Sequence, residues 1–313
     1  MKLNLVHQTK SMSFLPIDNI TLILKIQNEV LKAIHDFMYI QGLTQLMPII
    51  LSPLTDPLSH PVHEAQVNYL GQKLHLTRSM IFHKQIAIAR LGVKGIFIMS
   101  PNVRLEMGNL EKSNKHLLEF TQLDIELKNQ SALEFRSFIE KLIVFIFSRV
   151  KEFCNEELEK LGVEIRIPRI LFKEYWSWDL KEKYGDNYSE TVSIQEKDPF
   201  WITDFEREFY DREDPHQKGH YYNYDLFYPE GFGEALSGGE RDYKYNILIR
   251  KIKERKQDPE EFKNYLELAK KRILVPSVGG GLGIERLIRF LTKQAHIKDI
   301  TPFPKIPGQP VCF

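Results

Sequence analysis

The stretch from "GIFIMSPNVRLEM" to "LLEFTQLDIEL" combines a cation, several acids and an aromatic ring at alternating positions. Arg104 and Glu106 are two residues apart on an expected strand, so their side chains should point to the same side. Such a surface suits a nucleotide, because arginine can bind phosphate, a carboxylate can accept from the exocyclic amine, and a ring can stack on the base. A solvated face with one exposed phenylalanine is the alternative. The partner strand should present four side chains on one face: Phe120, Gln122, Asp124 and Glu126.

A second candidate is a pair of acids that flank a Pro/Gly turn in "YDLFYPEGFGEALSGGER". A hairpin here would bring Asp225 and Glu234 together, and two carboxylates beside bound phosphates are the expected way to hold Mg²⁺. Acids that merely flank a turn are the alternative. Arg241 comes shortly after a Gly-Gly pair, so its guanidinium could enter a tight pocket and bind a carboxylate through two hydrogen bonds.

A third candidate is the glycine-rich run "GGGLGIER" at residues 279–286, which leads straight into the apolar stretch "LIRFLT". Glycines allow close approach of the backbone to another group. Arg286, at the start of the expected helix, could bind an anion or stack on a flat ring. A tightly packed strand-to-helix turn with an exposed arginine is the alternative reading of this run.

The elements that would position these residues follow from the apolar spacing. Residues 20–40 show helical periodicity and end at Gly42, and the next stretch, "LTQLMPIILSP", is expected to be a buried strand interrupted by Pro48. Hairpins dominate the rest, so we expect an α+β fold with a mostly antiparallel sheet flanked by helices. Further helices are expected at residues 132–160 and 242–273, and a small inserted αβ element at about 161–200.

Composition narrows the class of protein. The 313 residues carry a formal net charge of +1, which gives no global basic field for nucleic acid. The only two cysteines, Cys154 and Cys312, provide no metal-binding spacing and no disulfide framework, which fits a reducing cytoplasm. Neither a membrane span nor a secretory signal is visible in the sequence. We therefore expect a cytoplasmic globular protein without membrane contact.

Three of these stretches together resemble the catalytic core of the class II aminoacyl-tRNA synthetases. "QGLTQLMPIILSP" is similar to that family's first motif, which builds the dimer interface, so the resemblance implies a homodimer. "FIMSPNVRLEM…HLLEFTQLDIEL" resembles the second motif and "GGGLGIERL" the third. "SMIFHKQIAIA" and the stretch with Asp225 and Glu234 resemble the amino-acid and metal segments of the aspartyl enzymes.

The resemblance implies ATP and Mg²⁺ as ligands and assigns roles to individual residues. Arg104 would hold the α-phosphate, Glu106 would read the adenine amine, Phe120 would stack on the ring, and His116 would lie in a loop that closes on ATP. The triphosphate and adenine would meet Arg286 and the backbone of the glycine run, including Gly281 and Gly283. Asp225 and Glu234 would hold Mg²⁺, with Glu234 also at the nucleotide. Aspartate would be bound by four residues: Ser79, Lys84, Gln122 and Arg241.

Two departures from the family pattern decide the expected reaction. The first-motif helix begins near residue 20, so we expect one catalytic domain over residues 1–313 without the N-terminal anticodon-binding barrel. The synthetases' Glu-Gly-Gly loop is replaced by "LTDPLSHPVHEAQV". In both respects the chain resembles the archaeal asparagine synthetases related to aspartyl and asparaginyl enzymes. This resemblance implies a ligase that converts aspartate, ATP and ammonia to asparagine, AMP and pyrophosphate through a β-aspartyl adenylate, with no tRNA.

Ammonia must lose its proton or be selected over ammonium, and Asp56 lies where the covering loop departs from the synthetases. Asp56 is therefore a candidate for ammonia handling, with His60 and His63 as alternatives, and an ordered polar loop without a catalytic role is equally compatible with the sequence. Three rival functions remain open. They are a tRNA-charging enzyme of the aspartyl or asparaginyl type, a non-catalytic regulatory paralogue, and an enzyme that transfers an activated amino acid to another protein.

Overall fold

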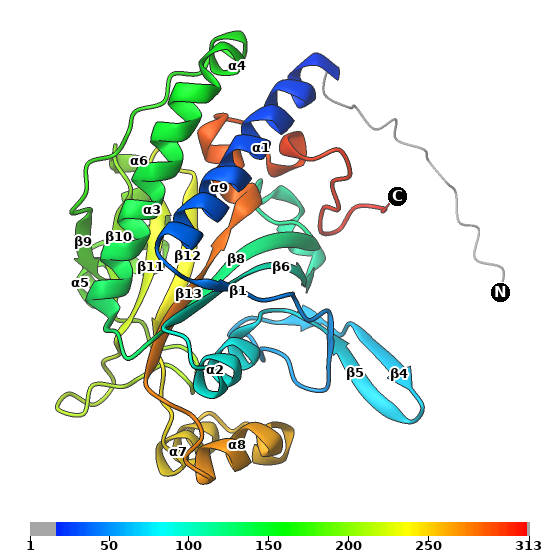
Figure 1. Cartoon of the computed structure of the whole chain (residues 1–313), viewed down its shortest axis with the longest axis vertical. Helices are drawn as coiled ribbons and strands as arrows, with labels where there is room; N and C mark the ends of the chain where they lie inside the picture. The colour runs from blue at the N-terminus through cyan, green and yellow to red at the C-terminus, as the bar shows by residue number, and fades with distance from the viewer. Residues whose placement is uncertain (1–16, 312–313) are drawn as a thin grey trace.

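The fold is built on one eight-stranded sheet, which the computed structural model describes within residues 17–311 (Figure 1). The strand order is β1-β6-β8-β13-β12-β11-β10-β9, and only the two outermost pairs, β1 with β6 and β10 with β9, are parallel. The predicted mostly antiparallel sheet with flanking helices is confirmed. Its strands are β1 (Thr44–Gln45), β6 (Gly95–Val103), β8 (Glu119–Lys128), β9 (Lys173–Trp176), β10 (Phe200–Thr203), β11 (Asn223–Tyr228), β12 (Gly233–Glu240) and β13 (Ser277–Gly283).

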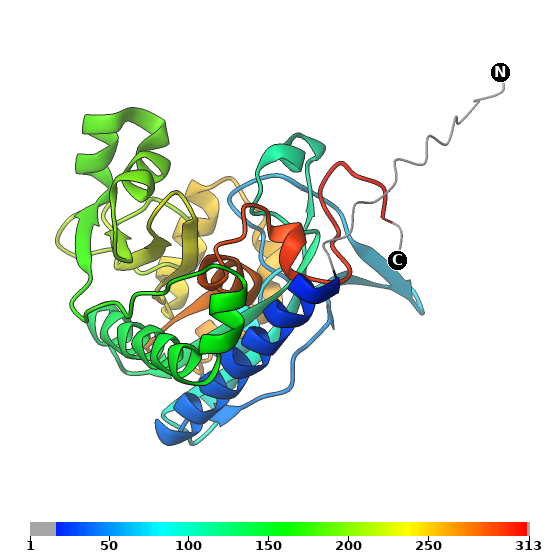
Figure 2. The ribbon, with the colours of Figure 1, turned by 90° about the horizontal axis from the view of Figure 1, so that it is seen from above.

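Three helices cover one face of this sheet, as the view from above shows for the long pair (Figure 2). They are α1 (Ile17–Ile40), α3 (Ala132–Phe153) and α9 (Ile284–Leu291). α3 begins with a capping box, in which the Ser131 hydroxyl accepts from the Glu134 N–H and the Glu134 carboxylate accepts from the Ser131 N–H. The predicted helix 132–160 is interrupted at Cys154 and continues as α4 (Asn155–Lys160).

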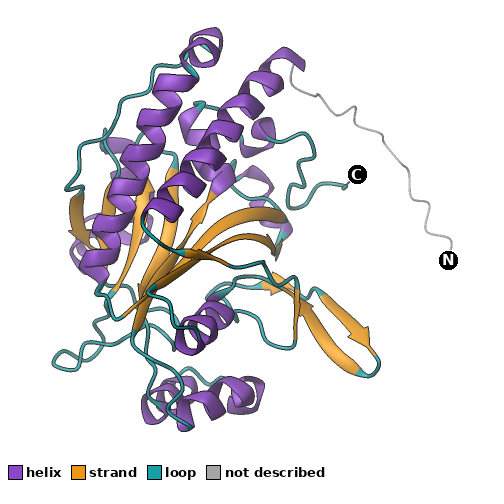
Figure 3. Ribbon diagram, in the orientation of Figure 1, coloured by secondary structure: helices purple, strands orange, loops and turns teal. Residues whose placement is uncertain are grey.

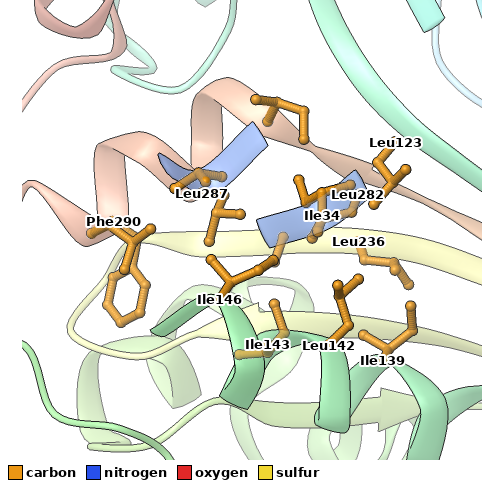
Figure 4. Packing of buried hydrophobic residues seen from close by; sticks show 14 of the residues in the cluster. Ile34, Leu123, Ile139, Leu142, Ile143, Ile146, Leu236, Leu282, Leu287 and Phe290 are labelled. Atoms are coloured by element: carbon orange, nitrogen blue, oxygen red, sulfur yellow. The ribbon is translucent and has the colours of Figure 1, made fainter. Parts of the chain in front are cut away.

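The main hydrophobic core lies between these helices and the sheet (Figure 4). Alternate residues of β8, Leu123 and Ile125, point into this core beside Ile34 of α1 and Ile143 of α3. Because side chains alternate along a strand, the intervening residues of β8 must face the opposite side of the sheet. That opposite face carries the polar residues. The core and the candidate site therefore lie on opposite sides of the same strand.

A second layer of helices packs near one end of the sheet on the polar side (Figure 3). Phe82 of α2 contacts Phe209, Phe262 and Tyr265, which ties α2 to the charged helical region. That region, predicted as helical at residues 242–273, is split at Asp258, where the Asp258 side chain caps a short 3-10 helix. The elements are α2 (Ile81–Arg90), α7 (Tyr245–Glu254), η3 (Pro259–Phe262) and α8 (Lys263–Lys270).

Smaller elements surround this framework. A projecting hairpin and short bridging strands lie between α1 and β6 and in the following loop: β2 (Leu51–Ser52), β3 (Val62–His63), β4 (Gln66–Tyr69), β5 (Gln72–Leu76) and β7 (Leu105–Glu106). Residues 161–200 contain β9, which forms one edge of the sheet, and end where β10 begins. That they are an insertion stays a prediction. The remaining helices are η1 (Gly108–Lys112), α5 (Ser177–Tyr184), η2 (Gly185–Asn187), α6 (Tyr188–Gln195) and η4 (Ile297–Ile300).

The stretch around Pro48 differs from its expectation. Instead of one buried strand it forms two two-residue strands, β1 and β2, joined by extended chain. Met47 is 87% exposed and Ile50 is 55% exposed. Proline cannot donate to a ladder, so the chain leaves the sheet after Gln45. Within residues 17–311, none of the helices combines the length and the apolar character that a membrane crossing requires.

Candidate active site

A cavity of about 270 Å³ opens on the polar face of the sheet, above the centres of β8, β13, β12 and β11. The residues along its wall come from all three stretches that the sequence singled out and from α2. Most of the predicted site residues line it: Asp56, Ser79, Lys84, Arg104, Gln122, Asp225, Glu234, Arg241 and Gly281.

One end of the cavity is a buried ionic network. The Lys84 ammonium donates to Asp124 Oδ1 at 2.8 Å and to the Gly280 carbonyl at 3.1 Å. Arg241 donates to both oxygens of Glu126 at 3.2 and 3.3 Å and lies 3.6 Å from Asp211. The two cations expected to bind an amino acid therefore lie together, and each is already paired with protein carboxylates.

This network contains more buried carboxylates than the sequence predicted. Three buried carboxylates, Asp124, Glu126 and Asp211, face two cations. Burial raises the pKa of Asp124, although Lys84 opposes the shift. Asp124 Oδ2 has no hydrogen-bond partner in the described structure and lies at the cavity wall, so it is available to accept a proton donor from a ligand.

The glycine run explains how these polar side chains fit on the sheet. A Cβ on Gly279 would collide with the Glu126 carboxylate, and one on Gly281 would collide with the Gln122 amide. Here the glycines of β13 make room for side chains of the neighbouring strand β8. Gly283 is different, since a Cβ there would meet only Arg286 at ordinary contact distance.

Arg104 and Glu234, both predicted for the nucleotide, line the cavity. The other residues predicted for the nucleotide are not in its wall: Glu106, His116, Phe120, Gly283 and Arg286. The Arg104 guanidinium lies 5.1 Å from the centre of the Phe120 ring and donates to the Arg78 carbonyl. Arg286 donates to the Glu234 carboxylate at 3.0 Å. His116 contacts Ser113, and burial together with the nearby Arg286 lowers its pKa to about 4, so the imidazole is neutral at pH 7.

The strand expected to carry both Arg104 and Glu106 is broken at Arg104, which lies between the end of β6 and the start of β7. The Glu106 N–H bonds the Arg104 carbonyl at 2.8 Å, and Glu106 joins a separate short ladder with Val62. Both oxygens of its carboxylate lie 3.2 Å from His60 Nε2. His60 is therefore a partner of Glu106, whereas His63 is exposed and does not line the cavity.

Asp225 and Glu234 lie on the two strands of the β11–β12 hairpin and both line the cavity. They are not direct cross-strand partners, because Asp225 pairs with Ser237 and Glu234 with Phe227, and a register shift lies between Leu226 and Phe227. The pKa of Asp225 is raised to about 6, because burial and the nearby Glu234 outweigh the opposing effect of Arg207. The pKa of Glu234 is lowered, because Arg286 and Arg207 outweigh the effect of burial.

This pair fits Mg²⁺ bound jointly with phosphates. The described residues contain no group of three acidic or histidine side chains able to form an all-protein metal site. Mg²⁺ commonly uses one or two carboxylates together with substrate phosphates.

Sequence reasoning missed the segment that closes one side of the cavity. Arg207, Glu208, Tyr210 and Asp211 all line it. The signal was present in "DFEREFYDRED", where acids and arginines alternate immediately after a buried strand. Burial, together with the carboxylates of Asp56 and Asp211, raises the pKa of Glu208 to about 8.

Asp56 anchors the loop that was expected to handle ammonia. Its Oδ1 accepts from the Leu58 N–H at 3.1 Å and from the Tyr210 hydroxyl at 3.2 Å. These bonds hold the loop against the segment with Tyr210.

The sequence and the fold of this chain are similar to those of known tRNA ligases. The profile of the class II tRNA synthetases (D, K and N) matches residues 7–307. Asparagine–tRNA ligase of Pyrococcus abyssi is 28% identical over 93% of this chain and 69% of its own length. Aspartate–tRNA(Asp/Asn) ligase of Methanopyrus kandleri is 30% identical over 90% of this chain and 67% of its own length.

Solved structures agree on the fold. The asparaginyl-tRNA synthetase of Pyrococcus horikoshii, complexed with asparaginyl-adenylate, superposes with a TM-score of 0.83 at 22% identity. The superposition covers 94% of this chain and 70% of that one.

The expectation of an ammonia-dependent asparagine synthetase that does not use tRNA is therefore wrong. The curated relatives that span most of this chain are tRNA ligases, and the matching solved structures are tRNA synthetases. The expectation rested on the expected absence of an N-terminal barrel and on a variant loop. Neither feature determines which nucleophile takes the activated amino acid. Asp56 lines the cavity and its Oδ1 is bonded within the loop, and a catalytic role for it stays a prediction.

Proposed function

Because the chain belongs to the class II tRNA synthetases (D, K and N), we propose that it activates asparagine or aspartate with ATP and transfers it to tRNA. The observation that carries this proposal is a single cavity with two chemically distinct ends. Arg104 and Glu234, which is bonded to Arg286, lie toward one end, and the buried network of Lys84 and Arg241 forms the other. Such a cavity suits the joining of a polyphosphate to a small polar amino acid.

The amino-acid end offers groups for either side chain. The Lys84 and Arg241 cations suit the carboxylate of aspartate. The unpartnered Asp124 Oδ2 suits the side-chain amide of asparagine, which can donate to it. Gln122 and Ser79 line the same end and would complete the pocket.

The reaction has two balanced steps. An oxygen of the amino-acid α-carboxylate attacks the α-phosphorus of ATP, and the bond to pyrophosphate breaks. A ribose hydroxyl at the 3′ end of tRNA then attacks the carbonyl carbon, so that AMP leaves and the proton passes to solvent. Arg104 would stabilise charge that develops on the α-phosphate, and Arg286 would bind the departing phosphates. Mg²⁺ held by Asp225 and Glu234 would neutralise phosphate charge when it is bound.

The first experiment is amino-acid-dependent exchange of labelled pyrophosphate into ATP by the purified chain, with asparagine and aspartate tested separately. We expect exchange with at least one of them, and loss of exchange in Arg104→Gln. Arg90→Gln, which alters an exposed arginine at the end of α2, is the matched control and should retain exchange. A folded protein that gives no exchange with either amino acid would overturn the proposed activation.

The second experiment separates activation from transfer. The exchange-competent protein is incubated with ATP, labelled amino acid and total tRNA, and acid-precipitable label is counted. We expect labelled tRNA, with the label released by mild alkali as an ester. Exchange without tRNA labelling would support adenylate formation and would refute transfer to tRNA.

A further inference from the structure

Arg207 occupies the position beside Asp225 that a metal ion would be expected to approach. Its Nη1 donates to Asp225 Oδ1 at 2.7 Å and to the Ser237 hydroxyl at 2.7 Å. Nη2 lies 3.4 Å from the Gly238 carbonyl. The guanidinium thus reaches the site from the loop that follows β10, whereas its partners belong to β11 and β12.

The remaining donor of this arginine has no partner. Arg207 Nε is buried without a hydrogen bond in the described structure and lies 3.9 Å from Asp211 Oδ2. Asp211 is therefore a second carboxylate within short reach of the same guanidinium. The backbone is held separately, because Arg255 donates to the Arg207 carbonyl at 2.8 Å. The side chain can change partners without movement of the loop backbone.

Arginine also neutralises the other member of the acidic pair. Arg286 donates to Glu234 in the same way that Arg207 donates to Asp225, so each predicted metal-binding carboxylate has its own guanidinium. Two guanidinium groups beside the pair repel a third cation and occupy oxygens that it would need. ATP changes this balance, because its phosphates bring negative charge and further oxygen ligands into the cavity.

We propose that Arg207 keeps Asp225 closed to divalent cations in the nucleotide-free protein and gives up this carboxylate only when the metal arrives with ATP. The guanidinium then turns toward Asp211, the carboxylate that lies beside its unused Nε. The proposal rests on the proposed function, since it takes the cavity to be the ATP site. It makes Arg207 a positioning residue that sets the order in which metal and nucleotide bind.

The test is Mn²⁺ binding to the full chain without nucleotide, measured by the loss of the free-ion electron paramagnetic resonance signal. The wild-type protein should bind Mn²⁺ weakly. Arg207→Gln should bind one ion at least roughly tenfold more tightly, since an adjacent cation changes the affinity of a carboxylate for a proton on this scale. Arg207→Gln/Asp225→Asn should lose the gain, which would assign the new site to Asp225.

A matched control comes from the same loop. Arg212 pairs with Glu240 at 2.6 Å, is exposed, and does not line the cavity. Arg212→Gln should bind Mn²⁺ as the wild type does. Equal Mn²⁺ affinity in the wild type and in folded Arg207→Gln would overturn the proposal. Tight nucleotide-free binding by the wild type would overturn it as well, and that measurement does not depend on whether the variant folds.

The outcome is separable from that of the proposed function. A gain of Mn²⁺ binding in Arg207→Gln without pyrophosphate exchange in the wild type would uphold the role of Arg207 at Asp225 and reject amino-acid activation. Exchange in the wild type with no change of Mn²⁺ binding in the variant would reject the role of Arg207 alone.

Discussion

Lys84 Nζ lies 2.8 Å from Asp124 Oδ1, and both side chains are buried beneath the cavity. Removal of the cation leaves Asp124 without its buried countercharge, whereas Glu126 keeps Arg241. We expect Lys84→Met to lower the free energy of unfolding by about 3–5 kcal/mol, the usual cost of breaking a buried ion pair. Denaturant titration monitored by circular dichroism measures this.

The double variant separates charge from packing. Lys84→Met/Asp124→Asn removes both charges, so it should recover part of the lost stability. A double variant less stable than Lys84→Met would show that the ion pair is not the source of the loss.

Arg104 is positioned by two contacts, the Arg78 carbonyl and the Phe120 ring. These contacts fix the guanidinium before any nucleotide arrives, so its loss should affect the charge-developing step most strongly. We expect Arg104→Gln to lower kcat of pyrophosphate exchange by roughly 10²–10³-fold, the range found when one preorganised donor is removed. A rise of KM for ATP at unchanged kcat would instead show a role in binding alone.

Glu285 links stability to pH. Both of its carboxylate oxygens accept the Thr121 N–H, at 2.8 and 2.9 Å, yet burial raises its pKa to about 7. The folded state then holds a proton that the unfolded state has released between pH 4.5 and 7. Stability from this group is therefore present below the unfolded pKa and is lost as the pH rises through the window, by at most about 3 kcal/mol.

The check compares free energies of unfolding at pH 5 and pH 8 for the wild type and Glu285→Gln. The variant should lose less stability between the two pH values than the wild type does. Glu152→Gln, at an exposed position on α3, should retain the full wild-type difference. Parallel pH dependence in the wild type and Glu285→Gln would refute the assignment.

The two glycines of β13 should respond differently to alanine. A methyl group at Gly279 meets the Ile125 carbonyl as well as Glu126, so the backbone of β8 would have to move. At Gly281 the methyl group meets only the flexible Gln122 side chain among its nearest contacts. We expect Gly279→Ala to destabilise the fold by several kcal/mol, as overpacking does, and Gly281→Ala to cost less but to impair amino-acid binding.

Thermal unfolding and KM for the amino acid measure these two effects. Equal destabilisation by the two substitutions would contradict the contact geometry. A KM unchanged in Gly281→Ala would show that Gln122 does not need its present position for binding.

Local patterns predicted the parts of the site that lie on regular strands. Period-two alternation put Gln122, Asp124 and Glu126 on one face of β8, and the turn between Asp225 and Glu234 brought those acids to one hairpin. The remainder depends on contacts between distant segments. Nothing in the sequence around Arg207 indicates that its side chain reaches Asp225, because that contact depends on how a loop folds back over two strands.

Two further features were not predicted from the sequence, for similar reasons. The pairing of His60 with Glu106 requires β3 to join β7, and strands of two residues give no periodic signal. The stretch around Met47 is exposed, although its apolar composition predicts burial. Composition alone does not show whether an apolar surface is covered within the same chain.

The strand β8 lies between the hydrophobic core and the cavity. Leu123 and Ile125 pack against the helices of the core, and the alternating residues Gln122 and Asp124 line the cavity on the other face. A substitution that enlarges or shrinks the core beneath β8 would shift the side chains that we propose bind the amino acid. We therefore expect natural variation at Leu123 and Ile125 to be limited by the proposed catalysis as well as by stability. Selection on the cavity face of β8 would then also constrain the residues on its core face.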